Sequence, residues 1–131
     1  MTRHQMRQNA FLLTFERIFN TDPVEQLLEL ARECENVELD DQVIELFAGV
    51  DEKKEQLDAE IGKYLKNWSL ARISKVSLAV LRIAMYEMIY CADIDNDIAI
   101  SEAVKIAQEY TTKEDVSFVN GVLSSAEKAM R

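Results

Sequence analysis

The sequence predicts an all-α fold, organised as a single domain over residues 1–131, and three observations lead to this prediction. The chain has only 3 glycines and 1 proline, too few for the tight turns of a sandwich, a barrel or a doubly wound sheet. Its 131 residues are 48% hydrophobic and 30% charged, a composition typical of a globular domain that buries a core without a metal or a disulfide. Apolar residues recur at helical spacing along most of the chain.

The first half of the chain is predicted to form three helices. Residues 3–19 have an apolar face (Phe11, Leu12, Phe15, Ile18, Phe19) and a polar face that we expect to be solvated (Arg3, Arg7, Thr14, Arg17). Asp22 and Pro23 resemble an N-cap followed by the first helical position, which predicts a second helix to about Glu33. A third, long helix is expected from about Leu39 to Leu65, with its acidic residues outward.

The second half is predicted to form three more helices after a connection at residues 68–73. The segment from Val76 to Tyr90 is apolar nearly all round and should be the buried central helix. Another helix follows from about Asp97 to Tyr110, and a capping box at 112–115 begins a last helix that ends near Met130. Gly121 lies inside that last helix at a cost of roughly 1 kcal/mol relative to alanine, which indicates a close approach by another backbone or by a ligand. The two bundles that these helices can form should share one core.

The charge is unevenly distributed along the chain. The net charge of −9 argues against binding to nucleic acid, because a phosphate backbone repels such a surface. By segment, however, residues 1–20 carry +3 −1 = +2, residues 21–60 carry +3 −14 = −11, residues 61–90 carry +5 −1 = +4, and residues 91–131 carry +4 −8 = −4. Two basic segments therefore flank an acidic one.

No pattern in the sequence indicates an enzyme, a cofactor or a metal site. Cys34 and Cys91 lack the paired spacing of zinc or redox motifs, and we expect both to be reduced and buried. The single histidine, His4, reads as a surface residue. No apolar run is long enough to span a membrane and no export signal is apparent, so we expect a cytoplasmic protein with no membrane partner.

Three features could serve nucleic-acid binding, and each has a simpler structural explanation. Arg3 and Arg7 lie one helical turn apart and could contact phosphates, or could be ordinary first-turn charges. Arg82 must be neutralised on its apolar helix, either by Glu102 or Glu109 or by a phosphate. Phe118 could stack on a base beside Ser117 while Asn120 reads the base edge, or Phe118 could belong to the core.

Four segments of the sequence resemble the NusB family of bacterial transcription antitermination factors in content, order and spacing: WSLARI at 68–73, LRIAMYE at 81–87, AISEAV at 99–104 and FVNGVL at 118–123. The series Arg3, Arg7, Ala10, Phe15 is similar to the basic first helix of that family, so the resemblance covers essentially the whole chain. It is weakest over residues 20–66.

The resemblance implies a non-catalytic, all-helical RNA-binding module of two small bundles sharing one core. It implies that the chain pairs with NusE, a small-subunit ribosomal protein, that the pair reads the single-stranded boxA element of ribosomal RNA leader transcripts, and that the RNA polymerase antitermination complex is a further partner. Carried over by position, the RNA-contacting residues would be Arg3, His4, Arg7, Tyr64, Arg82, Phe118 and Asn120. Ser77 occupies a partner-binding position where many relatives have an acid, which would weaken the NusE contact.

Two other functions remain open on the sequence. The chain could be a protein-only adaptor, including a homodimer that masks its RNA face. It could also be the RNA-binding domain of a ribosomal RNA methyltransferase that carries a NusB-like head. If the chain is an antitermination factor, we expect RNA to lie along a basic patch made by the first helix and residues 61–90. The acidic helix predicted within residues 21–60 should then face away from the RNA.

Overall fold

A computed structural model of the protein describes residues 1–66 and 68–130. It contains α1 (Arg3–Phe19), α2 (Val24–Glu33), α3 (Asp41–Glu52), α4 (Lys54–Gly62), α5 (Lys75–Tyr90), α6 (Asn96–Tyr110) and α7 (Lys113–Met130). No strand occurs among the described residues. The predicted all-α class is confirmed.

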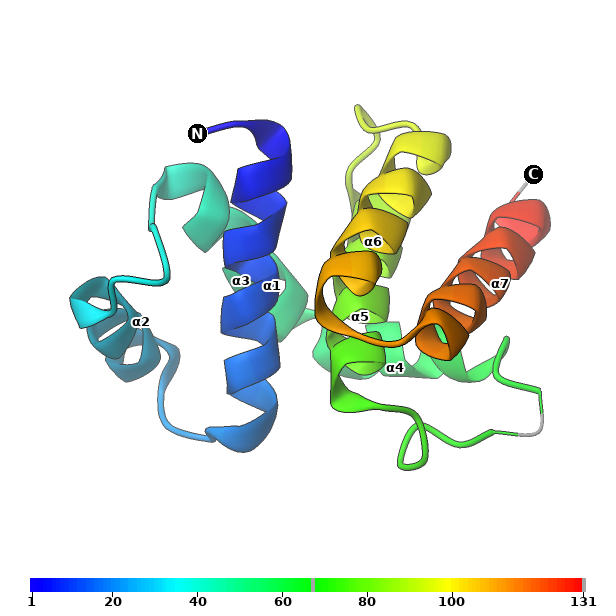
Figure 1. Ribbon diagram of the computed structural model, residues 1–131, viewed down its shortest axis with the longest axis horizontal. Helices are drawn as coiled ribbons and strands as arrows, with labels where there is room; N and C mark the ends of the chain where they lie inside the picture. The colour runs from blue at the N-terminus through cyan, green and yellow to red at the C-terminus, as the bar shows by residue number, and fades with distance from the viewer. Residues whose placement is uncertain (67, 131) are drawn as a thin grey trace.

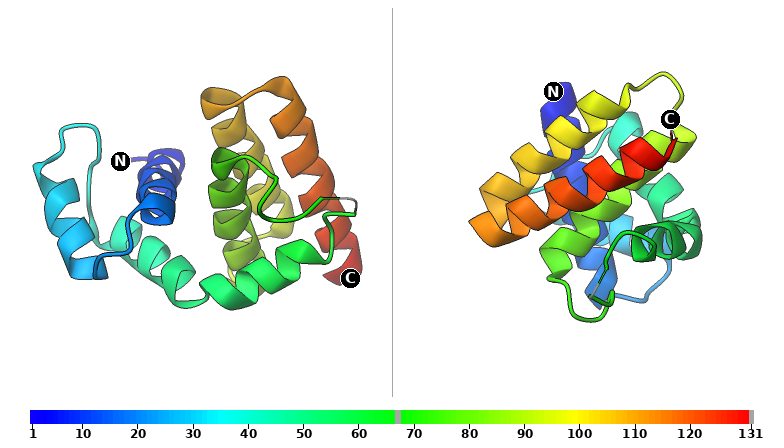
Figure 2. Two further views of the ribbon diagram at one scale, coloured as in Figure 1. Left: turned by 90° about the horizontal axis from the view of Figure 1, so that it is seen from below. Right: turned by 90° about the vertical axis from the view of Figure 1, so that its right-hand side faces the viewer.

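Helix α5 lies at the centre of the molecule (Figure 1), as its nearly continuous apolar sequence predicts. Helices α1, α2 and α3 lie on one side of it, and α4, α6 and α7 on the other (Figures 1 and 2). One hydrophobic cluster takes residues from all seven helices, with Phe11, Phe47, Leu81 and Leu123 among its largest fully buried members. The two bundles therefore share a core, as expected.

The long helix expected over residues 39–65 is in fact two helices. Asp40 caps α3 by accepting a hydrogen bond from the Val43 amide at 2.8 Å, and α3 ends at Lys53, whose ψ of 11° departs from helical geometry. The chain then continues in a new direction as α4 (Figure 2). The break allows the apolar side of α3 to pack on α1 while Leu57 and Ile61 of α4 pack into the core beside α5.

Local expectations at the caps and on the first helix were partly wrong. Pro23, rather than Asp22, is the N-cap of α2, and no side chain caps that helix. Thr112 does cap α7, accepting from the Asp115 amide at 3.2 Å. On α1, Thr14 is buried because its hydroxyl donates to the Ala10 carbonyl at 2.8 Å, whereas Phe19 is exposed.

Both cysteines are free thiols, but neither is buried as expected. Cys34 is exposed and Cys91 is half-buried. Among the described residues, no group of three His, Cys, Asp or Glu side chains is placed to hold a metal ion. No described helix has the length and apolar character that crossing a membrane would require.

Candidate nucleic-acid interface

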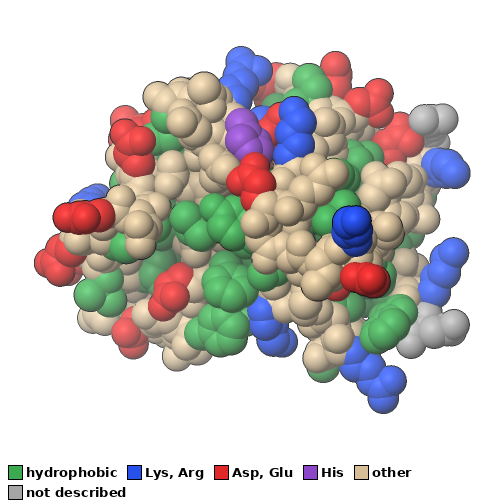
Figure 3. All heavy atoms as spheres, viewed as in Figure 1, with side chains coloured by type: hydrophobic (Ala, Val, Ile, Leu, Met, Phe, Trp, Pro, Cys, Tyr) green, Lys and Arg blue, Asp and Glu red, His purple; other side chains and the backbone are tan. Residues whose placement is uncertain are grey.

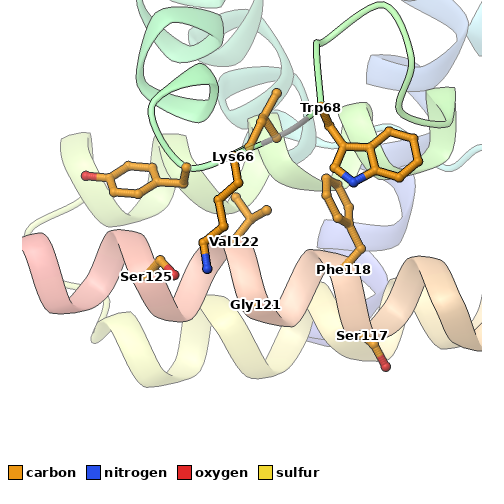
Figure 4. Close-up of a pocket in the computed structure, with 9 residues that line it drawn as sticks. Lys66, Trp68, Ser117, Phe118, Gly121, Val122 and Ser125 are labelled. Carbon is orange, nitrogen blue, oxygen red and sulfur yellow. The ribbon is translucent and has the colours of Figure 1, made fainter.

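An open groove lies between the turn after α4 and the first half of α7 (Figure 4). Its volume is about 360 Å³, and its lining includes Tyr64 and Phe118, two residues that are 54 positions apart in sequence. The other lining residues are Leu65, Lys66, Trp68, Ser117, Gly121, Val122 and Ser125. Two of the residues that were predicted to contact RNA are thus brought to one site.

Aromatic rings form one wall of this groove. Trp68 is 55% exposed, and its ring lies at 68° to that of half-buried Phe118, with centroids 6.4 Å apart. The amide of Trp68 donates to the Leu65 carbonyl at 3.0 Å. Both rings also line a second hollow of about 370 Å³, in which Arg72 takes part. A large, exposed aromatic surface of this kind is suited to stacking on unpaired bases.

Of the cations of the basic segment 61–90, Lys66 lines this groove and Arg72 lines the hollow that shares its aromatic wall, while Lys63 is paired with Glu60 at 2.8 Å. Lys63, Lys66, Arg72 and Lys75 are all exposed. Lys66 has a φ of 52°, a left-handed conformation that is uncommon for a residue with a side chain. Its side chain extends across the groove toward α7 (Figure 4). Figure 3 shows several Lys and Arg side chains on this side of the molecule, whereas acidic side chains predominate over α2 at the other end.

Gly121 faces open space in this groove. A Cβ added at this position would meet no other described atom within 4 Å outside its own stretch of helix. The close approach by another backbone that the sequence suggested is therefore absent from the described structure. The alternative, an approach by a ligand, remains compatible with the open groove.

Arg7 was expected to face solvent and contact RNA, and this expectation requires correction. The side chain is only 3% exposed, because it is enclosed between α1 and α5. Its Nε donates to both carboxylate oxygens of Glu87, at 3.0 and 3.1 Å, and its Nη2 donates to one of them at 2.9 Å. Burial by itself would lower the pKa of Arg7, but the hydrogen bonds and charge of Glu87 raise it.

Arg82 is also held internally, by a carboxylate that the sequence analysis did not identify. It is 9% exposed, and its Nε and Nη2 donate to the two oxygens of Asp58 at 2.8 and 2.9 Å. Asp58 lies on α4, so the pair joins that helix to α5. The expected partners, Glu102 and Glu109, instead bind His4. In this structure Arg82 forms an ion pair with Asp58, which resolves the sequence's choice of partner in favour of a carboxylate.

His4 links α1 to α6. Its Nδ1 lies 2.6 Å from Glu102 and its Nε2 lies 2.8 Å from Glu109, and Gln8 also donates to Glu109. Hydrogen bonds to Glu102 and then to Glu109 raise the pKa of His4, because both stabilise the imidazolium. His4 is partly exposed rather than a free surface residue, while Arg3 is exposed at the start of the helix.

The single basic patch expected along α1 and residues 61–90 is not formed. Helices α5 and α6 stand between α1 and α7 in Figures 1 and 2. The start of α1, with Arg3, is thus remote from the groove that holds Phe118. Of the three arginines of α1, Arg7 is buried and Arg17 is tied to Asp51 at 3.0 Å. The exposed cations near the aromatic wall belong to residues 63–75 instead.

Two further predicted residues lie elsewhere. Ser77, expected to contact a partner, is 0% exposed, and its hydroxyl has no hydrogen-bond partner within the described part of the chain. That prediction is wrong for the side chain, because Ser77 points into the core from the first turn of α5. Asn120 is exposed but lines a different hollow, beside Lys105 and Lys128, since two positions along a helix turn it away from Phe118.

Sequence reasoning missed Trp68 and Lys66. Trp68 was noted as part of a connection and of a segment that resembles the family, but not as a binding residue, although a tryptophan in a polar loop within a basic segment is a signal of a binding surface. The left-handed backbone of Lys66 had no signal in the sequence, because lysine does not favour that conformation.

Comparisons with known proteins agree with the fold. The NusB family model matches residues 4–128. The "Transcription antitermination protein NusB" of Clostridium botulinum (strain Alaska E43 / Type E3) is 37% identical, and the match covers 95% of this chain and 97% of the relative. Its counterpart in Clostridium novyi (strain NT) is 32% identical, with 98% and 100% covered.

Solved structures of related proteins are similar over nearly the full length. T. maritima NusB superimposes with a TM-score of 0.84 and 34% identity, covering 98% of this chain and 92% of that one. A structure described as antitermination factors NusB and NusE in complex with dsRNA gives a TM-score of 0.84 and 25% identity, covering 97% and 96%. The chain therefore belongs to the NusB family of transcription antitermination proteins.

Proposed function

We propose that this protein binds the single-stranded boxA element of ribosomal RNA leader transcripts together with NusE, within an RNA polymerase antitermination complex, and so promotes processive ribosomal RNA transcription. The observation that carries the proposal is the groove lined by Tyr64, Trp68 and Phe118 together with the exposed Lys66. Bases would stack on the rings, and Lys66 and Arg72 would contact phosphates. The relative solved with NusE and dsRNA supports both kinds of partner.

The other predicted RNA residues take different roles in this proposal. Arg3, His4 and Asn120 remain predicted contacts outside the groove, and a strand that reached them would have to extend beyond it. Arg7 and Arg82 act as positioning residues, because their ion pairs fix α1 and α4 against α5. The matched relatives are antitermination proteins over nearly their whole length, which favours this function over the methyltransferase-domain alternative.

The decisive experiment is fluorescence anisotropy with boxA RNA and a scrambled control, each with and without NusE. We expect boxA to bind more tightly than the scrambled RNA, and NusE to strengthen the difference. Equal affinity for both RNAs, with NusE present, would contradict sequence-specific binding. Sedimentation of the protein alone and with RNA would detect a homodimer whose interface competes with RNA.

Two variants test the groove itself. Phe118→Ala should lose one stacked base at a cost of about 1–3 kcal/mol in binding. Because Phe118 also packs on the core, its thermal unfolding must be measured alongside; a variant that melts early yet binds normally when folded would assign Phe118 to the core. Lys66→Asn is the matched test of charge, since asparagine tolerates the left-handed backbone while removing the cation. We expect it to remain stable and to bind RNA more weakly.

A further inference from the structure

The second hollow, in which Arg72 takes part, adjoins the proposed RNA groove at its aromatic wall. Trp68 and Phe118, whose rings meet in Figure 4, line both spaces. The volume of the hollow is about 370 Å³. The rest of its lining comes from the segment that leads into α5 and from the first turn of α7, and consists of Arg72, Ile73, Ser74, Glu114 and Asp115. A strand of RNA that stacks in the groove can therefore place a neighbouring nucleotide here.

The charged side chains of this hollow differ in whether they already have a partner. The carboxylate of Asp115 is occupied, because the Thr111 hydroxyl donates to it at 2.5 Å. Arg72 and Glu114 are both exposed, and neither side chain forms a hydrogen bond or an ion pair with another residue that the structure describes. One free guanidinium and one free carboxylate thus line the same hollow beside the aromatic wall.

A free carboxylate beside an RNA surface limits what the hollow can bind. It repels phosphates, and an ionised carboxylate can only accept hydrogen bonds. It favours a nucleotide only when both of its oxygens meet N–H donors of the base. Guanine presents two adjacent donors, N1–H and the N2 amino group. Adenine and cytosine each present a donor beside an acceptor, and uracil presents one donor between two acceptors, so a carboxylate matches guanine best.

We propose that this hollow is a guanine-selective subsite for single-stranded RNA and that Glu114 determines the selectivity. The base would stack on the exposed ring of Trp68, and the carboxylate of Glu114 would accept from N1–H and from the N2 amino group. Arg72 would contact a phosphate, and its positive charge would offset that of Glu114. This inference rests on the proposed RNA function and adds to it a preference for one base.

The helix dipole offers a simpler explanation for Glu114, which lies in the first turn of α7. Glu25 provides a control for that explanation, because it is an exposed glutamate in the first turn of α2. Helix α2 lies at the other end of the molecule from α7 (Figure 1). Glu25→Gln therefore removes the same charge from the same kind of position without altering the hollow.

Labelled uridine decamers with one central guanosine, inosine or adenosine test the proposal by fluorescence anisotropy. The full chain is used without NusE, so that any preference belongs to this protein. We expect guanosine to bind about ten-fold more tightly than adenosine. Inosine, which lacks the N2 amino group, should lie between them.

Three variants separate base reading from charge. Glu114→Gln should reverse the preference to adenosine, because an amide presents one acceptor and one donor and so matches N6–H and N1 of adenine. Arg72→Gln should weaken all three RNAs alike and keep the preference for guanosine. Glu25→Gln should leave all three affinities nearly unchanged, since salt screens a distant charge. Thermal unfolding should be similar in Glu114→Gln and Glu25→Gln.

The outcomes that would overturn the proposal are distinct from those that would reject the RNA function. Tighter binding of all three RNAs by Glu114→Gln would show that the carboxylate only repels phosphate. Equal binding of the three RNAs by the wild type would overturn the guanine subsite and leave the RNA function intact. Failure to bind any of them, with or without NusE, would reject both.

Discussion

The guanidinium of Arg7 and the carboxylate of Glu87 form a buried, hydrogen-bonded ion pair between α1 and α5. The attraction between two buried charges is largely offset by the cost of removing both from water, so the pair adds little net stability to the fold. Removing one partner, however, leaves the other buried without a counter-charge. Glu87 is 1% exposed, so without Arg7 it would be left buried with no partner for its carboxylate. The pair therefore fixes how α1 sits on the central helix.

Arg7→Met should destabilise the protein by about 3–5 kcal/mol, because it leaves Glu87 as an uncompensated buried charge. The double variant Arg7→Met/Glu87→Leu should recover most of that loss, since it removes both charges. Urea unfolding measures both free energies. Were Arg7 instead a direct RNA contact, Arg7→Met would keep its stability and lose affinity for every RNA.

His4 provides a pH-dependent link at the start of α1. Its pKa is raised above the ordinary 6.5 by Glu102 and Glu109. Burial opposes the ionisation of Glu102, but hydrogen bonds from His4 and Lys105 outweigh it, and the pKa of Glu102 falls below 4.5. The stabilisation that His4 contributes is therefore complete below the pKa of His4 in the unfolded state, and it is lost as the pH rises through the pKa of His4 in the folded state. The stabilisation that Glu102 contributes is lost as the pH falls through the pKa of Glu102 in the folded state.

The protein should therefore lose stability as the pH rises above the ordinary 6.5 and through the raised pKa of His4 in the folded state. An NMR titration of the imidazole should give a midpoint above 6.5, the ordinary value. Glu102→Gln should move the midpoint downward and flatten the pH dependence of stability. An unchanged midpoint in that variant would show that Glu102 does not hold the imidazolium in solution.

At the scale of the helices, α7 combines a packed face with an open one. Val119, Val122, Leu123 and Ala126 are buried, whereas Gly121 faces the groove. A glycine inside a helix lowers stability relative to alanine, and nothing in the described structure requires its small size. An incoming ligand at the groove would explain why the position is left open.

Gly121→Ala should stabilise the fold by about 0.5–1 kcal/mol and at the same time weaken RNA binding. Gly62→Ala is the matched control, because a Cβ there also meets nothing within 4 Å but the residue is not part of the groove lining. It should stabilise the protein without altering affinity. Thermal unfolding and RNA anisotropy on both variants separate the two effects; RNA binding unchanged in Gly121→Ala would remove the ligand explanation.

At the scale of the whole molecule, the separation of charge decides how a chain of net charge −9 can approach RNA. Acidic side chains predominate over α2 (Figure 3), and this helix lies at the other end of the molecule from the segment that follows α4 (Figure 1). Arg7, Arg17 and Arg82 do not add to the exposed cations of residues 63–75, because internal carboxylates hold all three. Few positive charges are therefore available to RNA. A partner that supplies positive charge would therefore make a large difference to affinity.

The protein alone should bind boxA RNA weakly and with a shallow dependence on salt. NusE should raise both the affinity and the slope, with each additional neutralised phosphate adding about 0.7 to the logarithmic slope. Anisotropy titrations over a series of salt concentrations give these slopes. Identical slopes with and without NusE would mean that NusE contributes no phosphate contact.

The all-α class, the buried α5 and the ends of most helices follow from local properties, and all could be predicted from apolar periodicity and capping residues. The break at Lys53 could not, because it depends on which neighbours α3 and α4 pack against. Tyr64 was identified only through the family resemblance, whereas Phe118 was already a candidate for base stacking from the residues beside it. That they share a groove with Trp68 depends on how the turn after α4 folds onto α7.

The sequence by itself determined the fold class, the family and the unequal distribution of charge, because periodicity, motifs and residue counts are properties of the chain alone. Only the tertiary structure decided which charged residues are free. Arg7 and Glu87 are 80 positions apart, and Arg82 and Asp58 are 24 apart, so no local pattern could reveal that each arginine has its own carboxylate. A buried charge must find a partner wherever the fold supplies one, and that partner is set by packing in three dimensions.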